Sequence, residues 1–138
     1  MANQDRGERW EIFICKLKAR EIGLAYFFGS RQEAGPRLLQ GETVPEAPAS
    51  DLDLGVVFLV HPMDYRQLRG IRQELEDCLA PLFTPLRLHL LLLEEENAHV
   101  QHAAAIKGIE AYAVNEDFAR QYRRKVYTLY ADWHSWWP

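Results

Sequence analysis

The chain has 138 residues, 48% of them hydrophobic and 26% charged, with a formal net charge of −4 at pH 7. This is the size and composition of one globular domain, large enough to form a core without disulfides or a structural metal, and it excludes a uniformly basic nucleic-acid-binding protein. The polar N-terminus has no signal peptide, and no apolar run is long enough to span a membrane. We therefore expect a cytoplasmic protein without a membrane-spanning segment, and nucleic acid is not indicated as a partner.

The first two predicted elements are a helix and a buried strand. Apolar residues recur at helical spacing over residues 8–22, and Gly23 is a suitable helix stop. The apolar run over residues 24–28 ends at Gly29, which predicts a buried strand followed by a turn.

A long loop is expected between this strand and the next one. Residues 31–49 hold several glycines and prolines among residues of mixed polarity, which predicts a loop with room for a helical turn at residues 36–40. A lid, a partner surface and a tolerated insertion are all open as roles for this loop. The Leu- and Val-rich run over residues 52–60 then predicts a second buried strand, which His61-Pro62 ends.

Helices and strands alternate through the rest of the chain. Asp64 can cap a helix that reaches Leu79, and a turn with two prolines follows it. The elements expected next are a strand over residues 86–93, a helix over 98–107, an edge strand over 109–113 and an amphipathic helix over 116–136. The alternation predicts a single domain of the α/β or α+β class, in which helices flank a small mixed sheet. Its core covers residues 8–113, and the C-terminal helix follows.

Cysteines and aromatic residues give two further expectations. Cys15 and Cys78 both fall within apolar helical patterns, so we expect buried free thiols rather than a disulfide, as in a reducing cytoplasm. The C-terminal segment carries more aromatic side chains than the packing of one helix needs: Tyr122, Tyr127, Tyr130, Trp133, Trp136 and Trp137. A packed terminal helix and an interface, either between copies of this chain or with a partner protein, both fit this excess.

Two carboxylates open the second predicted strand. Asp51 and Asp53 are separated by one residue, so in an extended chain they share a face, with side chains ~7 Å apart. Oxygen ligands of this kind suit Mg²⁺, and a bound cation would offset the repulsion between two neighbouring carboxylates. The alternative is structural: Asp51 caps a turn, and Asp53 is an exposed strand residue.

A glycine and a serine close the first predicted strand. Glycine lets the backbone approach a phosphate, and successive N–H groups and the Ser30 hydroxyl can donate hydrogen bonds to it. Arg31, the next residue, can add a positive charge. Gly29-Ser30 alone is more often an ordinary turn, but its combination with Asp51 and Asp53 at the start of the next strand is far more specific.

The strings Phe28-Gly29-Ser30-Arg31 and Ser50-Asp51-Leu52-Asp53-Leu54-Gly55-Val56 together resemble the minimal nucleotidyltransferases of the polymerase-β-like superfamily. The resemblance extends over the helices before and after these strings and implies the nucleotidyltransferase fold. It also implies a nucleoside triphosphate, with ATP expected, held with two Mg²⁺ ions. By this resemblance Asp51 and Asp53 are catalytic metal ligands, and the nucleotide is bound by Gly29, Ser30, Arg31 and Ser50.

The third predicted strand departs from the pattern of this family. Active members usually carry a third carboxylate near its start, where this chain has Arg87, with His89 on the same face. A guanidinium stays protonated and repels cations, so Arg87 can neither hold a metal nor accept a proton. Arg87 can instead pair with Asp51 or Asp53 or bind a phosphate, whereas His89 can act as a base or be a structural strand residue.

Two functions follow from the resemblance. The first is a nucleotidyltransferase that binds Mg-NTP and transfers a nucleotidyl group to a hydroxyl of a protein tyrosine, a small molecule or an RNA end. The second is a catalytically degraded binding protein, because small members of this family often act as antitoxins that pair with an all-helical toxin. The intact Gly29-Ser30 and Asp51/Asp53 motifs favour the enzyme, and Arg87 favours the binding protein.

Overall fold

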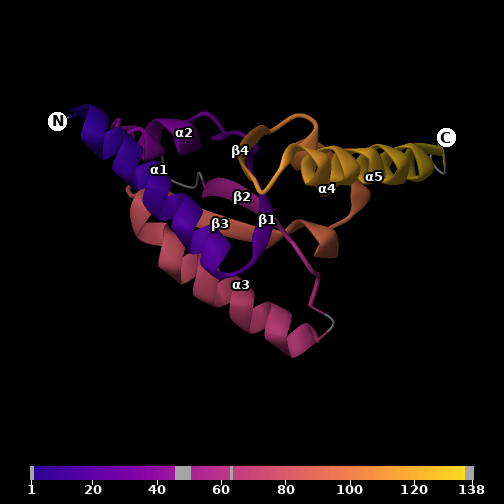
Figure 1. Cartoon of the computed structure of the whole chain (residues 1–138). Helices are drawn as coiled ribbons and strands as arrows, with labels where there is room; N and C mark the ends of the chain where they lie inside the picture. Colours follow the sequence, from indigo (N-terminus) through magenta and orange to yellow (C-terminus); the bar gives the residue numbers. More distant parts are fainter. Residues whose placement is uncertain (1, 46–50, 63, 136–138) are drawn as a thin grey trace.

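A computed structural model describes residues 2–45, 51–62 and 64–135 and shows a four-stranded mixed sheet (Figure 1). The strands are β1 (Ile22–Phe28), β2 (Asp51–Phe58), β3 (Arg87–Leu92) and β4 (Ile109–Ala113), arranged in the order β3-β2-β1-β4. β1 runs antiparallel to β2 and to β4, whereas β2 and β3 are parallel. The predicted class, a small mixed sheet flanked by helices, is confirmed.

Helices cover both faces of this sheet. They are α1 (Ala2–Ala19), α2 (Ala34–Leu39), α3 (Tyr65–Leu79), α4 (Ala98–Ala105) and α5 (Glu116–Ser135), with short 3₁₀ turns η1 (Ala80–Phe83) and η2 (Leu93–Glu95). One core layer packs α1, α2 and α3 against the sheet, and a second layer packs α4 and α5 against the opposite face. Figure 1 shows α4 and α5 side by side and well away from α1 and α3.

Alternation along β2 and β3 decides which face each side chain meets. Leu52 and Leu54 of β2, like Leu88 and Leu90 of β3, are buried in the layer that contains α1 and α3. The residues between them point to the opposite face of the sheet. The layer of α4 and α5 packs on that face farther along, near Leu93, so the first residues of β2 and β3 stay exposed there.

The first helix ends earlier than the sequence predicts. α1 stops at Ala19 and Ile22 already belongs to β1, with Glu21 between them at a positive φ of 56°. Gly23 is therefore not the helix stop. It lies within β1, where a Cβ atom would come within 2.6 Å of Phe118 Cε1, so close packing of α5 on the strand explains this glycine.

The segment between β1 and β2 contains more helix than the sequence predicts. α2 begins at Ala34, two residues before the expected turn, and Pro36 lies within its first turn. Proline is tolerated there because the first N–H groups of a helix have no intrahelical acceptor. Residues 46–49, the end of the predicted loop, lie outside the described residues.

Cys15 contradicts the expectation of two buried thiols. It is exposed on α1, because Phe13 and Leu17 face the sheet and a residue midway between them points the other way around the helix. Cys78 on α3 is half-buried, and both thiols are free. None of the helices in the described ranges has the length and hydropathy of a bilayer-crossing segment.

The C-terminal helix is packed along one side and exposed along another. Tyr122 and Val126 are buried in the core layer that α5 shares with α4, whereas Tyr127 is 56% exposed. Trp136 and Trp137, which the sequence adds to the same aromatic group, lie outside the described residues. An interface through the exposed side of α5 stays a prediction.

Candidate functional site

The predicted site residues meet at one edge of the sheet. Gly29 directly follows β1, and Phe28 pairs with Asp53 in the antiparallel register of β1 and β2. In the parallel register of β2 and β3, Asp51 lies opposite Arg87 and Asp53 lies opposite His89. The end of one strand and the starts of two others therefore bring five of the predicted residues together: Gly29, Asp51, Asp53, Arg87 and His89.

Gly29 packs directly against a carboxylate of the next strand. Its φ is +83°, which an L side chain rarely adopts, and a Cβ atom at this position would lie 2.6 Å from Asp53 Oδ2. Two independent constraints thus require glycine here. The backbone of the turn consequently touches the side chain that is predicted to bind a metal.

The turn after β1 presents free backbone donors. Gly29 O accepts a hydrogen bond from the N–H of Gln32, and Arg31 O accepts one from Ala34, but the N–H groups of Ser30 and Arg31 donate to no other described residue. Successive free N–H groups next to a residue in the left-handed region form a concavity that binds anions. The turn is therefore a candidate phosphate-binding loop.

Arg31 faces the segment before β2. Its Nη2 donates a hydrogen bond to Pro45 O over 3.0 Å. This contact joins the turn after β1 to the far part of the loop. Ser50, the remaining predicted nucleotide-binding residue, lies outside the described residues.

Asp53 pairs with a histidine across the neighbouring strand. His89 Nδ1 and Asp53 Oδ1 are 3.0 Å apart, and the two side chains are 52% and 29% exposed. Water screens a pair this exposed, so its contribution to stability is small. The pair instead fixes the orientation of the imidazole ring. Nδ1 of His89 faces the Asp53 carboxylate, and Nε2 lies on the far side of the ring.

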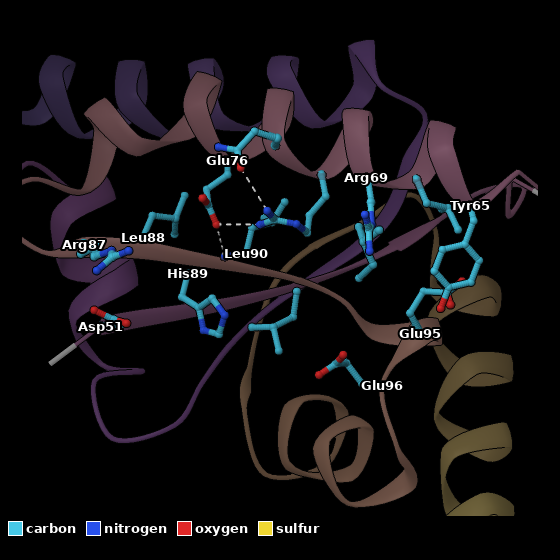
Figure 2. Close-up of a pocket in the computed structure, with 15 residues that line it drawn as sticks. Asp51, Tyr65, Arg69, Glu76, Arg87, Leu88, His89, Leu90, Glu95 and Glu96 are labelled. Atoms are coloured by element: carbon cyan, nitrogen blue, oxygen red, sulfur yellow. Dashed lines mark hydrogen bonds and ion pairs between the residues drawn. The ribbon is translucent and has the colours of Figure 1, made fainter. Parts of the chain in front are cut away.

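Arg87 does not form the ion pair that was one of the two roles open to it. It lies opposite Asp51 in the sheet and Figure 2 shows it beside that residue, yet within the described ranges no ion pair joins it to Asp51 or Asp53. The partner of Asp53 is His89 instead. A long exposed side chain gains little from one fixed pairing in water, whereas the shorter imidazole lies directly opposite its carboxylate.

A cavity of about 570 Å³ opens beside the site and runs between β3 and α3 (Figure 2). Asp51 and Arg87 lie at one end of it, and Tyr65 lies at the other. Polar side chains of α3 line its wall: Arg69, Arg72, Gln73 and Glu76. The cavity gives a second molecule room to reach the site from the side of β3.

Glu76 joins α3 to the outer edge of β3. Its Oε2 accepts hydrogen bonds from the backbone N–H of Leu90 over 3.0 Å and from Arg72 Nη1 over 3.1 Å. The sequence indicates the Arg72–Glu76 pair by its i,i+4 spacing. Nothing in the local sequence indicates the contact with Leu90, which depends on how α3 docks beside the strand.

Within the described ranges, the acidic side chains form no complete metal site by themselves. Across the described residues, no three His, Cys, Asp or Glu side chains are grouped as a metal site. Asp51 and Asp53 supply two carboxylates on one face, to which a bound triphosphate would add oxygen ligands. By the resemblance described above, a second metal would need a third carboxylate at the position of Arg87.

Three solved structures share this architecture over nearly the whole chain. A variant of the MntA–HepT toxin–antitoxin complex matches at 16% identity with a TM-score of 0.66, covering 91% of this chain and 89% of the matched chain. A tri-AMPylated Shewanella oneidensis HEPN toxin in complex with MNT antitoxin matches at 16% identity and a TM-score of 0.64, covering 94% and 90%. A toxin–antitoxin with AMP-PNP matches at 16% identity and a TM-score of 0.63, covering 91% and 90%.

These likenesses show the fold. The matched chains are nucleotidyltransferase-fold proteins, so the predicted nucleotidyltransferase fold is confirmed. No family model matches the sequence, and no curated protein matches it.

Proposed function

We propose that this chain is a nucleotidyltransferase-fold antitoxin that binds a nucleoside triphosphate with Mg²⁺ and transfers its nucleotidyl group to a hydroxyl of a helical partner toxin. The observation that carries this proposal is the contact between Gly29 and Asp53. It sets a turn with free N–H donors against a carboxylate, and this is the combination that a magnesium-bound triphosphate requires.

Each residue of the edge has a role in binding. The N–H groups of Ser30 and Arg31 and the Ser30 hydroxyl donate hydrogen bonds to phosphate oxygens. Asp51 and Asp53 hold the Mg²⁺ ion. When bound, the ion stabilises negative charge on the phosphates and on the leaving pyrophosphate.

The transfer itself needs a proton acceptor. The acceptor hydroxyl oxygen attacks the α-phosphorus, the bond from that phosphorus to the bridging oxygen of the β-phosphate breaks, and pyrophosphate leaves. His89 takes the hydroxyl proton on Nε2, because Nδ1 faces Asp53 and the carboxylate orients the ring. His89 thereby performs the part of the proton chemistry that Arg87 cannot.

Two of the structural relatives support the nucleotide and the partner. One contains AMP-PNP, and another contains an AMPylated HEPN toxin bound to its MNT antitoxin. For this chain we infer ATP as the nucleotide, a toxin as the acceptor and the cytoplasm as the location. Contact with the toxin, or between copies of this chain, through the exposed side of α5 belongs to the same proposal.

The direct test is calorimetric titration of the protein with ATP in the presence and absence of Mg²⁺. We expect binding that depends on Mg²⁺ and is lost in the double variant Asp51→Asn/Asp53→Asn. Asp117→Asn is the matched control, since this carboxylate is 80% exposed on α5, far from the site in sequence and on another element. Absence of ATP binding by the wild type would overturn the proposal.

A second candidate function is an antitoxin that binds its partner toxin but transfers no nucleotidyl group. It is favoured by Arg87 in the position of the third carboxylate and by the pairing of Asp53 with His89. A binding-only antitoxin would neutralise its toxin equally well as wild type and as Asp51→Asn/Asp53→Asn. Co-expression of each form with the toxin distinguishes the two, because loss of neutralisation in the double variant supports the enzyme.

A further inference from the structure

The turn after β1 lies beside a second turn that connects α4 to β4. Phe27 pairs with Ile109 in the antiparallel register of β1 and β4. Gly29 directly follows β1 and Lys107 lies two residues before β4, so the two turns leave this strand pair at the same end. The Gln32 side-chain amide donates to Lys107 O over 3.5 Å, which joins the two turns.

Close packing keeps these turns together. At Gly108 a Cβ atom would lie 2.6 Å from Phe27 O and 3.1 Å from Phe28 Cβ, so the chain after α4 rests directly on the end of β1. Gly29 therefore has Asp53 on the side of β2 and the turn containing Lys107 on the side of β4. The two neighbours carry opposite charges.

Lys107 has an exposed ammonium with no ion-pair partner in the described part of the chain. It follows Ile106, the C-cap of α4, where the N–H groups of Ile106 and Lys107 donate to His102 O and the Gly108 N–H donates to Ala104 O. A helix C-terminus carries partial negative charge and would repel a nearby phosphate. A lysine at this point offsets that repulsion.

We propose that Lys107 binds the terminal phosphates of the nucleotide held by the Gly29-Ser30 turn. This inference rests on the proposed nucleotide-binding function and adds the orientation of the triphosphate in the site. The α-phosphate lies toward Asp51 and Asp53, and the β- and γ-phosphates lie toward Lys107. Lys107 thus makes the site selective for triphosphates over monophosphates, because only the longer chain reaches both ends.

The test compares the affinities of ATP, ADP and AMP, each with Mg²⁺, for wild type and Lys107→Ala. We expect the variant to bind ATP about tenfold more weakly, as for one lost charge-assisted contact, with a smaller loss for ADP and none for AMP. Lys107→Arg should keep most of the ATP affinity, and Lys107→Glu should lose more than Lys107→Ala. Lys18→Ala, which removes an exposed lysine from α1, is the matched control.

The outcomes distinguish a failure of this inference from a failure of the proposed function. A wild type that binds no ATP overturns the proposed function and this inference with it. A wild type that binds ATP, together with a Lys107→Ala variant whose ratio of ATP to AMP affinity is unchanged, overturns only the role of Lys107. Far-ultraviolet circular dichroism and thermal melting check that each variant is folded. If Lys107→Ala does not fold, the ATP affinities of Lys107→Arg and Lys107→Glu are compared instead.

Discussion

His89 and Asp53 face each other across β3 and β2, with Nδ1 and Oδ1 3.0 Å apart, two residues along β3 from Arg87, the residue at the position where active members of the resembled family usually carry a third carboxylate. The contact leaves Nε2 as the ring nitrogen available to a substrate. His89 thus contacts one carboxylate oxygen of Asp53, a predicted metal ligand, and its Nε2 atom is the proposed base beside that ligand.

Replacement of His89 by alanine tests its role as a base. We expect His89→Ala to lower the rate of nucleotidyl transfer at saturating ATP by about 10²–10⁴-fold, since a positioned base contributes that much to proton transfer. ATP binding should be unchanged or tighter, because Asp53 gains a free oxygen. Transfer of label from α-labelled ATP to the partner toxin measures the rate, and His99→Ala on α4 is the control. An unchanged rate would show that His89 has only a structural role.

Arg87→Asp should rebuild the missing third ligand. A carboxylate placed opposite Asp51 adds oxygen donors and removes a positive charge, so we expect Mg²⁺ to bind at least about tenfold more tightly without nucleotide. Titration with Mg²⁺ followed by calorimetry measures the change. Arg69→Asp, which makes the same charge change elsewhere in the same cavity, should have a much smaller effect. Equal affinities in wild type and Arg87→Asp would contradict this account.

Gly29→Ala should cost both stability and nucleotide binding. A residue with a side chain at φ +83° costs about 1–2 kcal/mol, and the added methyl group must also displace the Asp53 carboxylate. Gly70→Ala is an informative control, because Gly70 lies within α3 and a Cβ there meets no atom within 4 Å. That change should stabilise the protein by about 0.5–1 kcal/mol through helix propensity. Urea unfolding of both variants measures the difference, and a Gly29→Ala variant as stable as wild type would refute the packing argument.

Tyr26 should make the protein sensitive to alkaline pH. Its burial, and secondarily the charge of Glu110, raise the pKa of the Tyr26 hydroxyl to about 12, although Arg123 opposes the shift. Below pH 10 the tyrosine is protonated in both the folded and unfolded states. Between pH 10 and 12 the unfolded chain releases this proton and the folded chain retains it, so stability falls by up to about 1.4 kcal/mol per pH unit.

The comparison of wild type with Tyr26→Phe isolates this effect. The buried Tyr26 hydroxyl makes no hydrogen bond in the described structure, so the substitution should leave stability at pH 7 unchanged or raise it by up to about 1 kcal/mol. Above pH 10 the variant should lose stability less steeply than wild type in urea unfolding. Parallel pH profiles for the two proteins would contradict the shift. Tyr122→Phe, which removes a 2.8 Å hydrogen bond to Gln101 Oε1, should by contrast destabilise the protein at neutral pH.

The sequence predicts those parts of the fold and site that depend on local patterns. Asp51 and Asp53 alternate with buried leucines, and Gly29 ends an apolar run, so both half-sites can be located without knowing the tertiary structure. The pairing of Asp53 with His89 depends on the parallel register of strands that are 36 positions apart, which no local pattern encodes. Gly23 shows how a local pattern can mislead. A glycine that follows a helical pattern predicts the end of the helix, but this glycine makes room for Phe118 instead.

The side chain of Glu76 has a consequence for how other proteins can approach the sheet. β3 is an outer strand, and its unpaired N–H groups would ordinarily invite a further strand from another chain. At Leu90 that place is already filled by a carboxylate held by Arg72. A visiting strand can pair with β3 at Leu90 only by expelling Glu76. The Glu76 carboxylate therefore discourages copies of this chain from joining edge to edge at this point.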